Sequence, residues 1–560
     1  MSPSRTGAEY VVEALERYGV EHVFGNPGTT ELPVVQALND RPIEYVLALH
    51  EDVAVGMASG YASVRRYHSH HDPDVNPLGV ANLHVAPGLA HGVGNLIGAA
   101  FAGSPLLVTA GNYGTGFQHE EPILHGDLEA LVDQYTKWSA EVTNVDALPT
   151  MLRRAVRQAL TPPTGPVFLG LPLDVMLAET GVDVERLGPI PDAGRGDPDA
   201  IAAAADLLAE ATEPVVVIGD EVARSGPAAI DAAVELAETA GTRVHGEFIT
   251  AESNFPTDHP LWGGTVPGTE SGFVATLDTD TVVFVGCGSA TTSIDHDERL
   301  LPEATIVQLG PDPWELGKNW PADASVIGDL GRVLPELVEG VESRLGEDDR
   351  RARRERAREA AAERREVGRP AEPDPDDPRA SKGELGRAMG EAASDALIVN
   401  EGVTAGRAVS FHVPLGPEQW LGTKSGGLGY GLPAAVGAAI AERERPEPRD
   451  VVSFIGDGSY FYYPQSIYSA VRHDVDLTVV VADNRNYRIL KDNTLRVLGG
   501  TEDDHEFRAM DFEPPFDIPA NAESYGAAGR LVDDPEAIAG TIEDARGESG
   551  PTVLDVLIHD

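Results

Sequence analysis

Two apolar runs in the last third of the chain each finish in a polar turn. Residues 451–455 and 477–482 are rich in β-branched side chains, and the segment between them is typical of a helix. This pattern predicts two parallel strands joined by a helical crossover, and therefore a parallel α/β sheet. Open α/β sheets bind ligands outside the carboxyl ends of their strands. The turns at residues 456–459 and 483–486 therefore predict a ligand site.

The residues of these turns are typical of a metal-bridged diphosphate site. Asp457 offers a carboxylate and Asn484 an amide oxygen, which are the hard ligands that Mg²⁺ prefers. Gly456 and Gly458 let the backbone approach a phosphate closely, and Ser459 lies at a helix start, where free N–H groups favour anions. Gly-Asp-Gly alone is more often a plain turn, but the second turn favours the site.

Length and composition limit the class of protein. The 560 residues are enough for three domains of ordinary size. No apolar run reaches membrane-spanning length and the start lacks the core of a signal peptide, so we expect a cytoplasmic protein without a membrane partner. The single cysteine, Cys287, excludes an internal disulfide and a cysteine-based metal cluster.

The charge of the chain is strongly negative. Formal net charge is −49, and the positive charge comes almost wholly from arginine. Such a surface repels nucleic acid and anionic membranes, so neither is expected as a partner. Because salt screens the self-repulsion, the acidic and lysine-poor composition predicts a halophilic source.

Strands and helices alternate along most of the chain, which predicts parallel α/β sheets. We expect three domains, at residues 1–178, 190–340 (Rossmann-like) and 381–560. Residues 345–380 are predicted to form a charged, solvated helix and a linker. No Gly-x-Gly-x-x-Gly opens a helix in the second domain, so a dinucleotide site is poorly supported there. The histidine cluster at residues 68–71 is predicted to be a surface insertion rather than a metal site.

Four further stretches carry a family resemblance: residues 23–33, 47–51, 82–84 and 425–435. Together with the turn at Asp457 and its distant Asn484, they make the chain similar to thiamin-diphosphate-dependent 2-oxo acid decarboxylases and acetolactate synthases. Benzoylformate decarboxylase-like enzymes are the most similar branch. The resemblance implies pyrimidine-binding, central and diphosphate-binding domains in chain order. It also implies a homodimer or homotetramer whose active sites are shared between subunits.

The resemblance assigns roles to three residues of the first domain. Glu51 matches the catalytic glutamate that binds the aminopyrimidine ring of the cofactor. His84 matches an active-site histidine, and Thr29 stands where benzoylformate decarboxylase has a serine that contacts the substrate. From the residues alone, Glu51 could be a helix-start carboxylate, Thr29 a helix cap and His84 a structural histidine.

The resemblance also assigns cofactor contacts to the third domain. The Gly426 carbonyl would accept the 4′-amino hydrogen bond, and Leu428 would hold the cofactor in its bent conformation. Val403 and Thr404 are candidate diphosphate contacts. The Asn486 backbone carbonyl would complete the metal ligands begun by Asp457 and Asn484.

Some positions depart from the family pattern. Asp483 replaces the first asparagine of the usual pair. Near Ser293, where benzoylformate decarboxylase has a second active-site histidine, there is none, and His296 is out of register. Residues 116–120 are similar to acetolactate synthases, whereas Glu401 is more like the decarboxylase branch.

The resemblance implies an enzyme that uses thiamin diphosphate and Mg²⁺ on 2-oxo acids. Its first expected reaction is non-oxidative decarboxylation to an aldehyde, which would make it a carbon–carbon lyase. One alternative is a transferase of the acetolactate synthase type, which joins two carbonyl compounds. A second is a paralogue that binds the cofactor without turnover. FAD in the central domain is possible, but the sequence does not support it.

Overall fold

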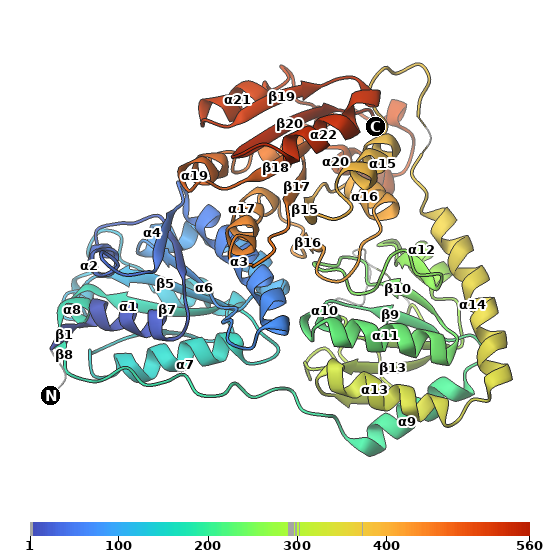
Figure 1. The fold of residues 1–560 in the computed structure, drawn as a ribbon, viewed down its shortest axis with the longest axis horizontal. Helices are drawn as coiled ribbons and strands as arrows, with labels where there is room; N and C mark the ends of the chain where they lie inside the picture. The colour runs from blue at the N-terminus through green and yellow to red at the C-terminus, as the bar shows by residue number, and fades with distance from the viewer. Residues whose placement is uncertain (1–3, 289–295, 297–298, 302, 372) are drawn as a thin grey trace. The chain divides into compact units, whose positions relative to one another are not determined.

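The computed structural model describes residues 4–288, 296, 299–301, 303–371 and 373–560. The chain forms three parallel sheets, each flanked by helices (Figure 1). Two compact units are distinguished by their internal contacts. The first comprises residues 1–190, 373–407 and 425–560, and the second comprises residues 191–372 and 408–424. The prediction of three parallel α/β domains is confirmed.

The first sheet has the strand order β3-β2-β4-β5-β7-β6. Strands β4 and β5 are buried along their whole length, as is typical of the centre of a parallel sheet. The strands are β2 (His22–Gly25), β3 (Glu44–Leu47), β4 (Gly79–Leu83), β5 (Leu106–Asn112), β6 (Ser139–Glu141) and β7 (Val167–Pro172), with the antiparallel pair β1 (Arg5–Thr6) and β8 (Glu179–Thr180). The helices are α1 (Gly7–Arg17), α2 (Leu32–Ala37), α3 (Glu51–His71), α4 (Ala86–His91), α5 (Val93–Phe101), α6 (Leu128–Val132), α7 (Leu148–Leu160) and α8 (Leu173–Leu177).

The central sheet has the strand order β11-β10-β9-β12-β13-β14. Counted from β9, this is the order 3-2-1-4-5-6 of dinucleotide-binding folds. The strands are β9 (Val215–Ile218), β10 (Arg243–Gly246), β11 (Trp262–Thr265), β12 (Thr281–Val285), β13 (Thr305–Gly310) and β14 (Ala324–Ile327). The helices are α9 (Pro198–Glu210), α10 (Glu221–Arg224), α11 (Pro227–Ala240), α12 (Glu270–Thr276), α13 (Leu330–Glu342) and α14 (Glu347–Val367).

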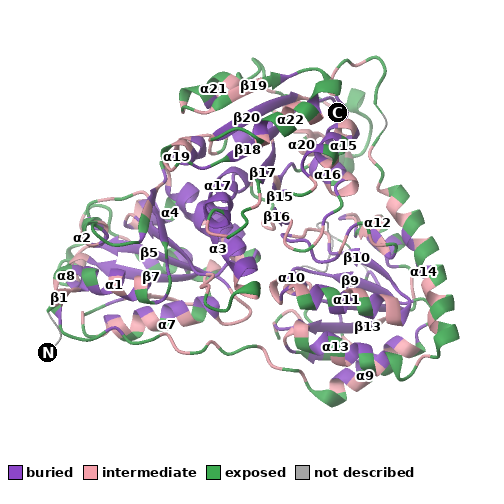
Figure 2. Cartoon of the chain, viewed as in Figure 1, coloured by how far each residue is buried: buried purple, intermediate pink, exposed green. Residues whose placement is uncertain are grey.

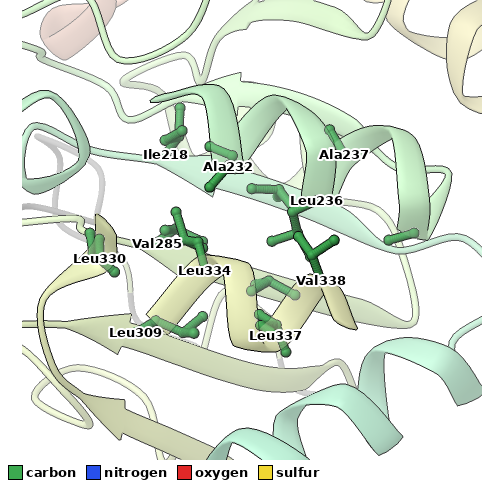
Figure 3. Packing of buried hydrophobic residues seen from close by; sticks show 14 of the residues in the cluster. Ile218, Ala232, Leu236, Ala237, Val285, Leu309, Leu330, Leu334, Leu337 and Val338 are labelled. Atoms are coloured by element: carbon green, nitrogen blue, oxygen red, sulfur yellow. The ribbon is translucent and has the colours of Figure 1, made fainter. Parts of the chain in front are cut away.

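Helices α11 and α13 cover one face of the central sheet with aliphatic side chains. Leu236 of α11 and Leu334 and Val338 of α13 belong to one cluster with Ile218 and Val285 of the sheet (Figure 3). Every one of these side chains is at most 4% exposed. Burial of apolar surface of this extent stabilises the central domain independently of any ligand.

The third sheet runs β15-β17-β18-β20-β19 within the first unit. Strands β17 and β18 pair in parallel, with Ile455 opposite Val481, so the predicted crossover is present. The strands are β15 (Leu397–Glu401), β17 (Val451–Gly456), β18 (Leu477–Asp483), β19 (Ala528–Val532) and β20 (Pro551–Leu557), and β16 (Trp420–Gly422) belongs to the segment at residues 408–424. The helices are α15 (Lys382–Ala392), α16 (Gly406–His412), α17 (Gly431–Glu442), α18 (Asp457–Tyr460), α19 (Ser466–Arg472), α20 (Arg488–Leu498), α21 (Ile518–Ser524) and α22 (Ile538–Arg546).

Helix α3 of the first domain packs against helix α17 of the third, and both are buried along most of their length (Figure 2). Glycines permit the close approach. A Cβ atom on Gly437 would lie 1.9 Å from the Met57 carbonyl oxygen, and one on Gly60 would lie 2.1 Å from that of Ala434. Small residues at these positions therefore let the two backbones touch.

The surface insertion predicted at residues 68–71 is wrong. These residues form the last turn of α3, and His68 is buried with its Nε2 atom 3.8 Å from a carboxylate oxygen of Glu442. The sequence signal was misleading because the Pro- and Asp-rich stretch begins only at Asp72, directly after the helix. In contrast, α14 is mostly exposed (Figure 2). In the described part of the chain, no helix is both long and apolar enough to cross a membrane.

Candidate cofactor site

The two turns that follow β17 and β18 form one wall of a single cavity. Residues 402–405 after β15, Leu428, residues 487–489 and Ile558 also line this cavity. The predicted residues on this cavity are Val403, Thr404, Leu428, Gly456, Asp457, Gly458, Ser459, Asn484 and Asn486. Among its described lining residues, Glu51, His84 and Thr29 are absent. Of the predicted third-domain residues, Gly426 is likewise absent from the described lining, so the cavity has the others and none of the predicted first-domain residues.

Asp457 has the environment of a carboxylate that needs a cation. It is 4% exposed, its Oδ1 atom accepts a hydrogen bond from the Gly458 N–H at 2.8 Å, and its Oδ2 atom has no hydrogen-bond partner. Burial and the neighbouring Asp483 raise the pKa of Asp457. A divalent cation would reverse both effects, so the site fits a bound metal ion.

The asparagines beside Asp457 supply further oxygen atoms. The buried Oδ1 atom of Asn486 has no hydrogen-bond partner. Asp560 fixes both amides, because it accepts from Asn484 Nδ2 at 2.7 Å and from Asn486 Nδ2 at 2.9 Å. Oxygen donors of this kind suit Mg²⁺ or Ca²⁺.

Glu401 is a functional candidate that the sequence suggested only as a branch marker. It is 2% exposed and accepts hydrogen bonds from the backbone N–H groups of Gly429 at 2.6 Å and Gly431 at 2.7 Å. Burial raises the pKa of Glu401 to about 7 in spite of these bonds. Glu401 thereby fixes the end of the loop that carries Leu428. In that loop Gly426 is exposed and has a φ angle of +71°, a conformation that favours glycine.

Glu51 begins α3 and is 7% exposed. Its Oε1 atom lies 3.3 Å from Asn26 Nδ2, and its Oε2 atom lies 3.3 Å from His91 Nδ1. Gly88 leaves room beside the carboxyl group, because a Cβ atom there would lie 3.0 Å from Oε1. The carboxyl group is therefore held in one orientation by two flanking side chains.

His84 follows β4 and is oriented by a residue that the sequence analysis missed. Its Nδ1 atom lies 2.9 Å from Glu31 Oε2, and Glu31 is 1% exposed. Glu31 also accepts from the N–H groups of Gly28 at 3.1 Å and Gly111 at 2.8 Å. Thr29, which lies between Gly28 and Glu31 in the sequence, is exposed. The only sequence signal for Glu31 was an acidic residue in the turn after β2. Its contact with Gly111 could not be predicted, because the two residues are 80 positions apart.

Ser293, near the position of the second family histidine, lies outside the described residues.

Three parallel α/β sheets, a cation-compatible cavity on the third and a buried glutamate on the first define a class of cofactor-dependent enzymes. Models of the thiamine pyrophosphate enzymes match in chain order: the N-terminal TPP binding domain at residues 5–136, the central domain at 201–337 and the C-terminal TPP binding domain at 404–556. The chain belongs to the thiamine pyrophosphate-dependent enzyme family.

Individual relatives cover nearly the whole chain. Benzoylformate decarboxylase from Pseudomonas aeruginosa is 30% identical over 97% of each chain. A probable acetolactate synthase large subunit from Methanocaldococcus jannaschii is 28% identical over 99% of this chain and 92% of its own. The structure of a 4-hydroxybenzoylformate decarboxylase from Rhodococcus jostii matches with a TM-score of 0.83 at 27% identity and 99% coverage of both chains.

Proposed function

We propose that the protein is a thiamin-diphosphate- and Mg²⁺-dependent decarboxylase that converts a 2-oxo acid to an aldehyde. The observation that carries this proposal is the pair of half-sites. A cavity with an unpartnered Asp457 oxygen lies on the third domain, and a buried, oriented Glu51 lies on the first. Thiamin diphosphate would use both half-sites, because its diphosphate would bind in the cavity and its aminopyrimidine ring would need a carboxyl group such as that of Glu51.

The third domain would hold the cofactor. Asp457, Asn484 and the carbonyl of Asn486 would bind the metal, with Ser459 and Thr404 beside the diphosphate. The loop at residues 426–428 would contact the thiazolium and aminopyrimidine rings. The bound cofactor would supply the nucleophilic carbon that adds to the ketone and the electron sink that lets CO₂ leave.

Glu51 would carry the first proton step. Its carboxyl group would hold a proton against a ring nitrogen of the aminopyrimidine and would favour the tautomer that can take a proton from the reactive carbon. Asn26 and His91 fix the carboxyl oxygens at 3.3 Å each, so little reorientation is needed. Retention of Glu51 argues against a paralogue that only binds the cofactor.

His84 would act on the substrate side. With Glu31 on Nδ1, the Nε2 atom is left to exchange a proton with the substrate carboxylate or the departing product. Thr29 offers a hydroxyl on the exposed turn beside it. Protonation by such a group favours aldehyde release over attack on a second carbonyl compound. The acetolactate synthase-type carboligase is therefore the second candidate.

Each site would combine two subunits, in a homodimer or a homotetramer. The support is the absence of Glu51, His84 and Thr29 from the described lining of the cavity in one chain. A neighbouring subunit would bring its own Glu51 to this cavity.

A panel of 2-oxo acids tests the reaction. The purified protein is loaded with thiamin diphosphate and MgCl₂, and aldehydes and acetoin-type products are measured separately. Aldehyde as the main product supports the decarboxylase. A 2-hydroxy ketone or an acetolactate-type product as the main one replaces it with the carboligase.

Metal removal tests the cofactor site independently of turnover. Calorimetry compares thiamin diphosphate binding before and after EDTA treatment, with MgCl₂ restored as the control. We expect binding to be lost and recovered. Equally tight binding in EDTA rejects the metal bridge.

A further inference from the structure

The central sheet has the topology of a dinucleotide-binding domain. Its strand order reverses between β9 and β12, and ligands of such sheets lie in the crevice outside the carboxyl ends of these strands. Asp220 follows β9 closely and Glu247 follows β10 directly. In dinucleotide-binding folds an acidic residue about 20 residues beyond the first turn binds a ribose hydroxyl group.

The crevice of this chain is occupied by a side chain of the chain itself. The ammonium group of Lys424 lies 2.8 Å from Asp220 Oδ2 and forms a second ion pair with Glu247 Oε1. The three side chains are 5%, 1% and 0% exposed. Glu247, the acid after the second strand that could bind a ribose, is therefore already paired with an ammonium group.

Asp220 is fixed by more than this ion pair. Its Oδ1 atom accepts from the Ala251 N–H at 3.0 Å and from Asn254 Nδ2 at 2.9 Å. Arg224 lies 3.6 Å from Oδ2 and supplies a second positive charge. A carboxylate with these partners is a rigid acceptor for an ammonium group.

The segment that carries Lys424 makes a second contact with the central domain, through its backbone. The Gly422 N–H in β16 donates to the Ala251 carbonyl at 2.8 Å. Ala251 also donates to Asp220, so the strand contact and the ion pair belong to one network. The chain is therefore held on both sides of Thr423. Ser425, the next residue after Lys424, begins the loop that would contact the cofactor.

We propose that Lys424 is a positioning residue that closes the ligand crevice of the central sheet and fixes the start of the cofactor loop. Two consequences follow. The central domain takes no FAD or other dinucleotide, because its crevice holds the ammonium group and two engaged carboxylates. Thiamin diphosphate binding depends on Lys424 although its side chain points into the central domain. The second consequence rests on the proposed function of residues 426–428.

A triple variant, Lys424→Ala with Asp220→Asn and Glu247→Gln, tests the positioning role. Lys424→Ala alone leaves two buried carboxylates without their ammonium partner and is expected to impair folding. The triple variant removes both the side chain that reaches the crevice and the charges it neutralised. We expect it to fold, as judged by circular dichroism, and to bind thiamin diphosphate at least ~10-fold more weakly than the wild type.

The matched control is Lys318→Ala with Glu315→Gln. This lysine and glutamate form a 2.6 Å ion pair in the same domain, and the pair is more exposed than Lys424 and its two partners. We expect the affinity of this control variant for thiamin diphosphate to stay within ~2-fold of that of the wild type. Wild-type affinity in the folded triple variant, or an equal loss in the control, overturns the positioning role.

Equilibrium dialysis of the wild-type holoenzyme against FAD tests the closed crevice. We expect no retained flavin absorbance, and binding of one FAD per chain overturns closure. If the wild-type chain fails to bind thiamin diphosphate, the proposed function fails instead. The flavin measurement then still decides whether the crevice is closed.

Discussion

At the scale of single residues, Glu51 separates catalysis from cofactor binding. Glu51→Gln keeps the size and the contact to Asn26, but it removes the carboxyl group that exchanges a proton. We expect turnover of the best 2-oxo acid to fall by ~10²-fold or more. Thiamin diphosphate affinity, measured by calorimetry, should change little. Unchanged turnover contradicts the proposed role of Glu51.

Glu31 offers a second test at this scale, because it acts through His84. Glu31→Gln replaces the anion that accepts from Nδ1 by a neutral amide, so the imidazole is held less firmly. We expect kcat to fall by ~10-fold with thiamin diphosphate affinity unchanged. In ¹⁵N NMR spectra, His84 should change from a single Nδ1–H tautomer to a mixture.

The control for Glu31 is Thr30→Val. It removes the hydroxyl that donates to Glu31 at 2.7 Å but leaves the contact between Glu31 and His84 intact. We expect near-wild-type kcat and an unchanged His84 spectrum. If Glu31→Gln and Thr30→Val lose the same activity and the His84 tautomer is unchanged in both, Glu31 stabilises the fold and does not orient His84.

Some site residues were predictable because their signal is local. Asp457 and Asn484 follow recognisable strands, and the pairing of β17 with β18 brings the two turns onto one cavity. Glu31 and Glu401 were not predictable as loop anchors. Their partners Gly111 and Gly431 lie 80 and 30 residues away, and a buried carboxylate that binds backbone N–H groups leaves no pattern in a single sequence.

At the scale of elements, the contact between α3 and α17 depends on glycine. Gly→Ala inside a helix normally stabilises by up to ~1 kcal/mol. Gly437→Ala should do the opposite, because the added Cβ would lie 1.9 Å from the Met57 carbonyl oxygen. We expect destabilisation of ~2 kcal/mol or more, seen as a lower urea midpoint.

Gly540→Ala is the matched control in helix α22. A Cβ atom there meets nothing within 4 Å, so we expect the midpoint to stay constant or rise. A Gly437→Ala midpoint at or above the wild-type value contradicts the close packing of the two helices. The same contact explains why residues 68–71 belong to α3 and not to the predicted surface insertion. The small residues of α3 give a weak apolar period, and burial by α17 stabilises the helix as far as His71.

At the scale of the whole molecule, two inactive variants test whether sites are shared. Glu51→Gln and Asp457→Asn change different domains. If a site takes Glu51 from one subunit and Asp457 from another, a mixed dimer contains one intact site. Refolding or subunit exchange of an equal mixture should then restore about a quarter of wild-type activity. Each variant alone is the control, and an inactive mixture containing mixed dimers places both residues in one chain's site.

The net charge of −49 leads to a prediction about salt. At low ionic strength the acidic surface repels itself, and at ~1 M salt the screening length falls to ~3 Å. We expect Tm to rise steadily between 0.1 M and 2 M KCl and activity to decay after dialysis into low salt. Sucrose at matched osmolality controls for solvent effects unrelated to charge and should not replace KCl. Full structure and activity after prolonged dialysis into low salt contradict adaptation to a salt-rich cytoplasm, because self-repulsion among the acidic groups would then be too weak to matter.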